Sequence, residues 1–395
     1  MAITDKEQGV WELEQVYNKI NQGSIWDYSG VRQLWIWGRN QQGSLGQNNL
    51  TERSSPVQVG TNAAFLSVNS GGQGQTTYAI NSSNELWVWG YGNGGALGLN
   101  GPNAARSSPV QIPGSWTSAI GSGGEPLAMG VKTDGTLWSW GAQEYGALGH
   151  NQAETSYSSP KQVGSDTDWA TGFDKYYPQG HTAWMLKTDG TLWATGYGSS
   201  GSLGLGNYTH RSSPTQVGTA TNWSVVGRNY GNSNAVINTD GELWVVGGNS
   251  HGSLGQNNTT ASTTLVQIPG TTWKCQTGTD EGMIATKTDG TLWSWGRNDN
   301  GEMGHNNGTQ YESPKQVPGT TWDRVISGYS SVIATKTDGT MWTWGGDNAY
   351  GQLGQNNTTQ YSSPVQMGTD TDWLSTAGSM SGQSSSGTGF GLKLL

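Results

Sequence analysis

The sequence predicts an all-β fold, a seven-bladed β-propeller with four-stranded blades, and three observations support this prediction. A Leu-Trp-x-Trp-Gly block returns seven times at intervals of about fifty residues, a period typical of propellers and solenoids. Its copies start at Leu34, Leu86, Leu137, Leu192, Leu243, Leu292 and Met341. Asp-Gly pairs lie between β-prone runs, and no helical periodicity separates these runs. Four-stranded sheets repeated radially are the blades of a propeller.

The unit of residues 273–322 contains the four predicted strands in order. They are expected around Trp273, over residues 284–288, over residues 291–296 and over residues 313–317. The Asp-Gly pair at 289–290 joins the second strand to the third. Such a pair favours a type I′ hairpin turn, because both central residues of that turn need positive φ.

Tryptophans, glycines and prolines recur at fixed places in these units. The two tryptophans of each block alternate with period two, so they share one face of the strand and can bury a large area. The second tryptophan is replaced by Thr195 and Val246 in the fourth and fifth copies. Each block is followed by a Gly-x-Leu-Gly element (Met in the sixth unit), which predicts left-handed backbone or close chain approach. Six of the following strands open at a proline, which suits a strand start or an edge.

The two ends of the repeat region are complementary. The first unit has no Asp-Gly hairpin before Leu34, and the last unit ends with a surplus β-prone run at Phe390–Leu394. We therefore expect residues 388–395 to pair with residues 32–38 and close the ring. Closure removes the open sheet edges that an unclosed array would leave.

Residues 1–24 differ from the repeats, so the predicted organisation is an N-terminal arm (1–24) and a propeller (25–395). The arm begins with capping-box spacing and predicts a short amphipathic helix. Its candidate docking residues are Val10, Trp11, Leu13, Val16, Tyr17 and Ile20. Two roles remain open for the arm: packing against the propeller, or docking into a groove of another protein.

Composition excludes several classes of protein. The net charge is −9 with 12% charged residues and no basic run, which argues against a nucleic-acid partner. No apolar stretch approaches 18 residues and the N-terminus has no apolar signal region, so we expect neither membrane insertion nor classical secretion. Cys275 is the single cysteine, so no intrachain disulfide can form.

The combined pattern resembles the regulator of chromosome condensation repeat family. The motifs that carry the resemblance are Asp-Gly-Thr-Leu-Trp-x-Trp-Gly, Gly-x-Leu-Gly and Ser-Ser-Pro-x-Gln-Val, over roughly residues 25–395. The resemblance implies a seven-bladed propeller. It implies no single function, because the family includes a nucleotide exchange factor for a small GTPase, a plant ultraviolet-B photoreceptor and a secreted β-lactamase inhibitor. The photoreceptor's Gly-Trp-Arg-His-Thr motif is absent here.

Few residues suggest a site. An irregular stretch with Phe173, Tyr176 and Tyr177 either forms an exposed recognition loop or packs over a neighbouring blade. The Asp-Thr-Asp segments 166–168 and 370–372 could contribute to a calcium site, although turn formation explains them better. His150 and His305 share one repeat position, which indicates a polar loop slot. No catalytic set, cofactor site or metal site can be named, so we expect a protein that is not an enzyme.

The function hypothesis from the sequence is a structural protein of a tailed-phage particle. The segment Gly-Val-Trp-Glu-Leu-Glu-Gln-Val-Tyr in the arm looks like N-terminal segments of tailed-phage virion proteins. Under this hypothesis the protein resides in the virion, the arm binds other virion proteins, and the propeller loops contact a host-surface glycan or protein. Two alternatives stay open: a cellular propeller regulator that binds a protein partner such as a small GTPase, and a glycan-binding propeller.

Overall fold

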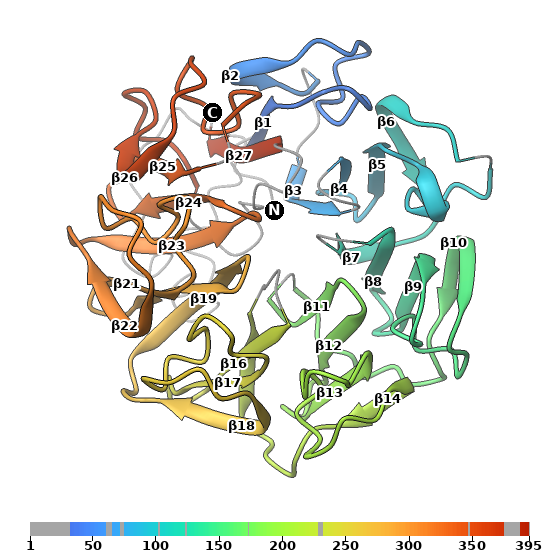
Figure 1. The fold of residues 1–395 in the computed structure, drawn as a ribbon. Coiled ribbons are helices and arrows are strands. Elements are labelled where there is room, and N and C mark those ends of the chain that lie inside the picture. Colours follow the sequence, from blue (N-terminus) through green and yellow to red (C-terminus); the bar gives the residue numbers. More distant parts are fainter. Residues whose placement is uncertain are drawn as a thin grey trace, which may run out of the picture.

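The computed structural model describes residues 32–394 except 61–64, 72–74, 102, 123–124, 173, 228–231, 347 and 375–387. In this part of the chain, seven small antiparallel sheets stand around a central axis (Figure 1). The predicted seven-bladed propeller is therefore confirmed. The described part contains one short 3-10 helix, η1 (Asn93–Gly95), and otherwise strands and loops.

The strands fall into four positions, numbered outward from the axis. First strands lie nearest the centre: β3 (Phe65–Gly71), β7 (Trp116–Gly121), β11 (Tyr176–Gln179), β15 (Trp223–Val226), β19 (Trp273–Thr279) and β23 (Trp322–Ser327). Second strands are β4 (Thr76–Asn81), β8 (Leu127–Lys132), β12 (Thr182–Leu186), β16 (Ser233–Asn238), β20 (Gly282–Lys287), β24 (Ser331–Lys336) and β27 (Thr388–Leu394). Third strands carry the tryptophan block: β1 (Arg32–Gly38), β5 (Leu86–Gly90), β9 (Leu137–Gln143), β13 (Leu192–Gly196), β17 (Leu243–Gly247), β21 (Leu292–Gly296) and β25 (Met341–Gly345). Fourth strands are β2 (Arg53–Gln58), β6 (Arg106–Ile112), β10 (Thr155–Gln162), β14 (Arg211–Gln216), β18 (Ser262–Ile268), β22 (Tyr311–Val317) and β26 (Tyr361–Gln366).

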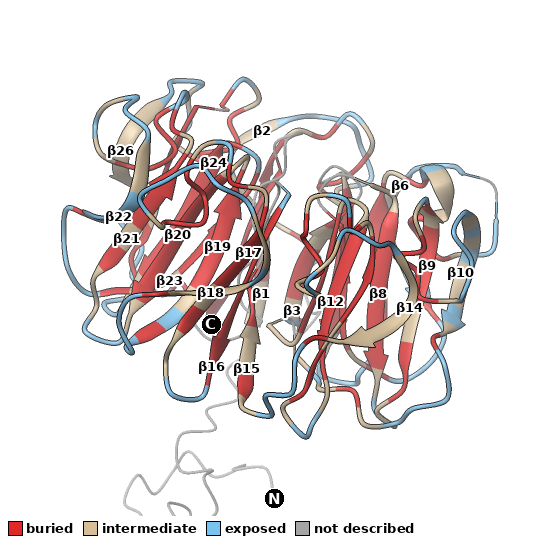
Figure 2. Cartoon of the chain, turned by 60° about the horizontal axis from the view of Figure 1, so that its bottom comes forward, coloured by how far each residue is buried: buried red, intermediate tan, exposed pale blue. Residues whose placement is uncertain are grey.

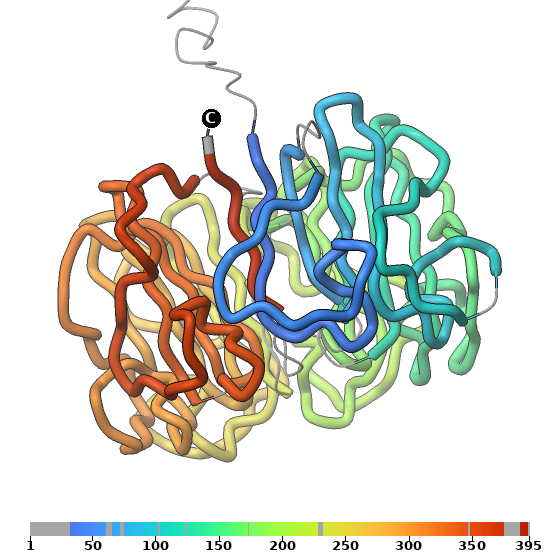
Figure 3. The backbone as a smooth tube through the Cα atoms, turned by 90° about the horizontal axis from the view of Figure 1, so that it is seen from above, coloured from blue at the N-terminus to red at the C-terminus, as the bar shows by residue number. Residues whose placement is uncertain are grey.

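We number the blades by their third strands, from blade 1 (β1) to blade 7 (β25). Blade 1 is assembled from both ends of the chain. Its sheet has the order β2-β1-β27, and Trp373 adds an isolated bridge to Lys393. Figure 3 shows the C-terminal strand running beside the N-terminal one.

The pairing in blade 1 confirms the predicted closure. β1 and β27 are antiparallel, with Arg32 opposite Leu394 and Gly38 opposite Thr388. The two terminal segments thus share an unbroken ladder. This pairing completes blade 1 from both ends of the chain and so closes the ring of seven blades.

The core runs through the strands and thins toward the loops at both ends (Figure 2). In the five blocks that have a second tryptophan, this residue is fully buried, at 0% exposure: Trp37, Trp89, Trp140, Trp295 and Trp344. Each of these indoles also donates a hydrogen bond of 2.8 to 2.9 Å to a carbonyl of the preceding blade's Gly-x-Leu-Gly element. The repeated motif therefore encodes both the core and the contact between blades.

The same contact crosses the closure of the ring. Trp37 in blade 1 donates to the Gln352 carbonyl in blade 7 at 2.8 Å. In blade 4, where Thr195 replaces the tryptophan, its hydroxyl donates to the Gly146 carbonyl of blade 3 at 3.0 Å. The contact between blades 7 and 1, where the ring closes, thus uses the same indole-to-carbonyl hydrogen bond that joins other neighbouring blades.

The prolines lie in the fourth strands, which are the outer edges of the blades. Pairing of the fourth strand with the third shifts register in every blade, and in the six blades that have the proline the shift lies near it. Proline has no N–H to donate, so an outer edge is where a ladder tolerates it. The edge position expected from the sequence is confirmed, but the expectation that these strands open at the proline is wrong, because β2 already begins at Arg53, three residues before Pro56.

Candidate functional site

The two ends of the propeller differ in the kind of connection they carry. We call one the loop face: it holds the loops between third and fourth strands, such as residues 144–154, and those between first and second strands. The other is the turn face, with the Asp-Gly turns and the links between blades. β1 begins and β27 ends on the turn face.

The turn face carries a repeated lysine–tryptophan stack. In five blades a lysine ammonium lies over two tryptophans. One tryptophan comes from the third strand, and the other from the start of the first strand or, for Trp169 and Trp373, from an isolated bridge. The five lysines are Lys132, Lys187, Lys287, Lys336 and Lys393. Each such contact stabilises by about 0.5–1 kcal/mol at partly exposed sites. These stacks clamp the inner and outer strands of a blade, which is a structural role.

The Asp-Thr-Asp segments belong to two of these stacks. Lys187 contacts Asp166 at 2.6 Å and Asp168 at 3.0 Å, and Lys393 contacts Asp370 and Asp372 in the same way. Burial alone would lower the pKa of Lys187, but its hydrogen bonds and charge interactions with Asp166 and Asp168 outweigh burial, so the pKa is raised. Since lysine neutralises these carboxylates, they form turns and ion pairs. Among the described residues, no group of His, Cys, Asp or Glu has metal-site geometry.

The histidine slot is confirmed as part of the framework. His150 Nε2 lies 2.9 Å from Ser139 Oγ, and His305 Nε2 lies 2.9 Å from Ser294 Oγ. Burial, with a smaller contribution from a nearby lysine, lowers the pKa of both imidazoles to about 4. In other blades Gln47 and Gln256 fill the slot and donate to strand carbonyls.

A buried acid lies in the Gly-x-Leu-Gly element of blade 6. Glu302 is 0% exposed, where the equivalent residues of other blades are Ser, Ala or Gln. Its Oε2 accepts from the Asn300 amide at 2.9 Å, while Oε1 has no hydrogen-bond partner among the described residues. Burial raises the pKa of this carboxyl to about 7. It lies between blades, away from any open pocket that the structure shows.

The loop face carries a half-exposed aromatic cluster between blades 3 and 4. We define it by Tyr145, His181, Tyr197 and His210. The Tyr145 ring lies 5.1, 5.0 and 5.1 Å from the other three, and Tyr197 stacks on His210. His210 Nδ1 accepts from the Gly198 amide at 3.0 Å, which fixes that ring. Three of the four residues are partly exposed and His210 is exposed, so this cluster presents aromatic surface to solvent.

Next to this cluster is an acidic depression of about 360 Å³ in blade 3. Its lining residues are Glu125, Ala142, Gln143, Glu144, Glu154, Thr155 and Ser156. His181 of the aromatic cluster lies 3.8 Å from Glu125, and Tyr145 follows Glu144 in the chain, so the two features are contiguous. The depression has the size of a small ligand site.

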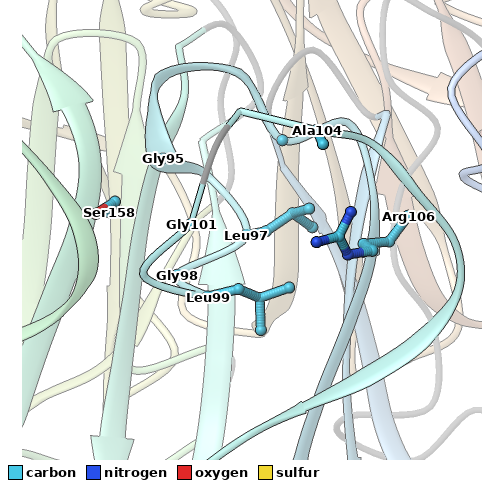
Figure 4. Close-up of a pocket in the computed structure, with 9 residues that line it drawn as sticks. Gly95, Leu97, Gly98, Leu99, Gly101, Ala104, Arg106 and Ser158 are labelled. Carbon is cyan, nitrogen blue, oxygen red and sulfur yellow. The ribbon is translucent and has the colours of Figure 1, made fainter.

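A second pocket is too small to bind a ligand (Figure 4). Its lining includes Gly95 and Gly98 of the Gly-x-Leu-Gly element of blade 2 and the nearby Arg106, and its cavity is about 10 Å³. That volume holds about one water molecule. Gly95 and Gly98 adopt the left-handed backbone conformation that the Gly-x-Leu-Gly pattern predicted.

The two described residues of the possible recognition loop, Tyr176 and Tyr177, are buried in a strand. Tyr176 and Tyr177 form the start of β11 and are 1% and 4% exposed. The Tyr176 hydroxyl contacts Ser118 of blade 3 at 2.8 Å, so it packs over a neighbouring blade. Hydrophobic burial of both rings in a first strand prevents them from meeting a partner. Phe173 lies outside the described residues.

The predicted docking arm also lies outside the described residues, with Val10, Trp11, Leu13, Val16, Tyr17 and Ile20 and the boundary at residue 24. Sequence reasoning did not find the aromatic cluster or the acidic depression. In the described part of the chain, no helix has the length and apolarity needed to cross a membrane.

Comparison with known proteins identifies the repeats. The family model of the regulator of chromosome condensation (RCC1) repeat matches residues 33–74, 134–171, 289–334 and 338–378. These four segments of the propeller are RCC1-type repeats. The chain is 28% identical over 190 residues to the ultraviolet-B receptor UVR8 of Arabidopsis thaliana, covering 46% of this chain and 41% of the receptor. It is 27% identical over 237 residues to the human E3 ubiquitin-protein ligase HERC2, covering 59% of this chain and 5% of the ligase.

Solved structures agree on the fold of these RCC1-type repeats. Prp20p of Saccharomyces cerevisiae superposes with a TM-score of 0.76 at 18% identity, covering 92% of this chain and 91% of Prp20p. The matched part of the chain spans less than half of UVR8 and a small fraction of HERC2. The structural match with Prp20p, by contrast, covers more than nine-tenths of both chains, at 92% and 91%.

These comparisons correct the phage hypothesis. The matched relatives are a plant receptor, a ubiquitin ligase and a yeast propeller, all cellular proteins. The prediction of a virion structural protein, located in the particle and bound to other virion proteins, is therefore wrong. The sequence signal behind it was one short segment in the arm, whereas the repeats extend over the rest of the chain.

Proposed function

We propose that this protein is a non-enzymatic regulator that binds a protein partner through its loop face. The observation that carries the proposal is the aromatic cluster of Tyr145, His181, Tyr197 and His210, whose rings are held rigidly and lie partly open to solvent. Rigid tyrosine side chains supply large contact area at little cost in conformational entropy, which suits a protein interface.

The relatives support the same class of function. The solved structure of Prp20p is described together with its binding to Gsp1p and histones. A small GTPase is one partner class that the repeat resemblance implies, and a basic protein is another. The net charge of −9 favours a partner with a positively charged surface.

The turn face is less suited to such binding. Its tryptophans are already engaged by lysine, and its Asp-Thr-Asp carboxylates are paired. Residues 1–24, the predicted arm, remain a proposed second contact. Capture of partners by a chain that lacks residues 1–24 would test it.

Affinity capture with purified bait variants tests the proposal. The loop-face variant is Tyr197→Ala with His210→Ala, and the matched turn-face control is Thr219→Ala with Thr369→Ala, both exposed residues. We expect wild type and control to retain the same saturable partner, and the loop-face variant to lose about tenfold in affinity. Thermal unfolding of each bait checks that it is folded. Retention by the loop-face variant together with loss by the control would contradict the proposal.

A further inference from the structure

The acidic depression beside the aromatic cluster is built from the ends of several strands of blade 3. Glu125 precedes β8, Gln143 ends β9, and Glu154 precedes β10. These residues meet because antiparallel pairing places Thr155 opposite Gln143. The depression therefore belongs to a rigid sheet end, which holds its groups in place before any ligand binds.

Gln143 provides unused hydrogen-bonding capacity at this site. Its side chain is 6% exposed, lines the depression, and has no partner at either Oε1 or Nε2 among the described residues. A buried amide without partners is unfavourable, so a ligand that supplies a donor and an acceptor would be stabilised there. The group can accept from an N–H donor and donate to a carbonyl.

The charge of the lining selects a cation. Glu125, Glu144 and Glu154 are the ionisable residues in the lining, and all three are acidic. Lys161, the lysine of the adjoining strand β10, is held by the Tyr157 hydroxyl at 2.8 Å and does not line the depression. Because these carboxylates are partly exposed, their attraction for a cation should weaken as the salt concentration rises.

A metal ion does not fit this arrangement. The described residues contain no group of three His, Cys, Asp or Glu close enough to hold a metal. Carboxylates that are spread apart suit a larger, delocalised cation. A guanidinium presents five N–H donors in a planar fork, so it can bridge an amide oxygen and a carboxylate and lie against an aromatic ring.

We propose that the acidic depression binds an arginine side chain presented by a basic segment of a protein partner. Gln143 Oε1 accepts from the guanidinium, Glu144 and Glu154 neutralise it, and Tyr145 borders it on the side of the aromatic cluster. The proposal rests on the protein-binding function above and assigns the partner's chemistry at one contact.

Fluorescence anisotropy with synthetic peptides and the full chain tests this assignment. The probe is a labelled Gly-Ser-Gly-Arg-Gly-Arg-Gly-Ser peptide, compared with versions in which lysine or neutral citrulline replaces arginine. The variants are Gln143→Leu and the pair Glu144→Gln with Glu154→Gln. Glu52→Gln, an exposed acid at the corresponding loop of blade 1, is the matched control.

We expect the arginine peptide to bind, the lysine peptide to bind more weakly, and the citrulline peptide not to bind. Gln143→Leu should weaken arginine binding about tenfold, the double acid variant at least as much, and Glu52→Gln not at all. Gln143→Leu also removes an unpartnered buried amide, so thermal unfolding should show a fold as stable as wild type.

Other outcomes overturn the assignment. Equal binding of arginine and lysine peptides that ignores Gln143→Leu would indicate diffuse attraction, and absence of binding by wild type at millimolar peptide would also reject it. If the captured partner depends on Tyr197 and His210 but not on Gln143, Glu144 or Glu154, the arginine site is wrong while the protein-binding function stands. If wild type captures no partner, the proposed function itself fails.

Discussion

Individual side chains in this propeller carry pH-dependent stability of opposite sign. The Glu302 carboxyl has a raised pKa and the two slot histidines have lowered pKa values, all because burial disfavours the charged form. Other blades have neutral residues at the equivalent positions: Gln352 corresponds to Glu302, and Gln47 and Gln256 correspond to the slot histidines. These replacements define clean tests.

Glu302→Gln should stabilise the protein above neutral pH. The folded-state pKa of about 7 lies above the unfolded value of 4.5, so the contribution of the neutral acid is complete below pH 4.5 and is lost as pH rises through 7. The amide stays neutral and can reproduce the bond from the Asn300 amide, as Gln352 does with the Tyr350 amide at 2.8 Å. Urea unfolding should show a gain of about 1–3 kcal/mol at pH 8 and little change at pH 5. Equal effects at both values would contradict this.

His150→Gln with His305→Gln should make the fold less sensitive to acid. A pKa lowered from 6.5 to about 4 gives a contribution that is complete above pH 6.5 and is lost as pH falls toward 4. Because both rings are partly exposed, we expect about 1 kcal/mol for each at pH 5. Unfolding free energies at pH 7.5 and pH 5 measure it. A wild-type-like drop between these values in the double variant would show that other groups cause it.

At the scale of strands, packing is tight where the C-terminal strand meets the first tryptophan block. A Cβ at Gly389 would lie 2.3 Å from Trp37 Nε1, the atom that donates to Gln352. β27 can therefore pack against β1 in this way because residue 389 has no side chain. Gly101, with its nearest atom at 3.7 Å, has no such restriction.

Gly389→Ala should destabilise the fold by about 1–3 kcal/mol, because the added methyl displaces a buried indole from a hydrogen bond. Gly101→Ala should stay within about 0.5 kcal/mol of wild type. Denaturant unfolding of the two variants side by side gives both numbers. Equal stabilities would mean that the closing strand repacks freely.

Much of this architecture could be predicted from the motifs. The Leu-Trp-x-Trp block and the Asp-Gly turns determine the strands, and the unmatched strand at Phe390 determines the closure, because these are local patterns repeated at one period. The aromatic cluster could not be predicted, since Tyr145, His181 and His210 come from separate loops that only the ring brings together. The sequence left two alternatives open for Tyr176 and Tyr177, because an aromatic pair has the same pattern in a buried strand as in an exposed loop.

The molecule as a whole depends on the pairing of its two ends. All other blades take consecutive strands from one stretch of chain, whereas blade 1 takes β1 and β2 from one end and β27 from the other. The rigid platform under the loop face, and with it the spacing between the depression and the aromatic cluster, requires a closed ring. Opening at blade 1 should therefore loosen its neighbours before the blades opposite.

Hydrogen exchange measured by mass spectrometry tests this closure most directly, comparing the full chain with one that ends at residue 387. The closed ring predicts strong protection of residues 32–38 in the full chain, and faster exchange there and in β25 of blade 7 after truncation. β12 and β13, across the ring, should be less affected. Should truncation abolish folding, Gly389→Ala provides the same comparison in a milder form. Unchanged protection of residues 32–38 would contradict closure by the C-terminal strand.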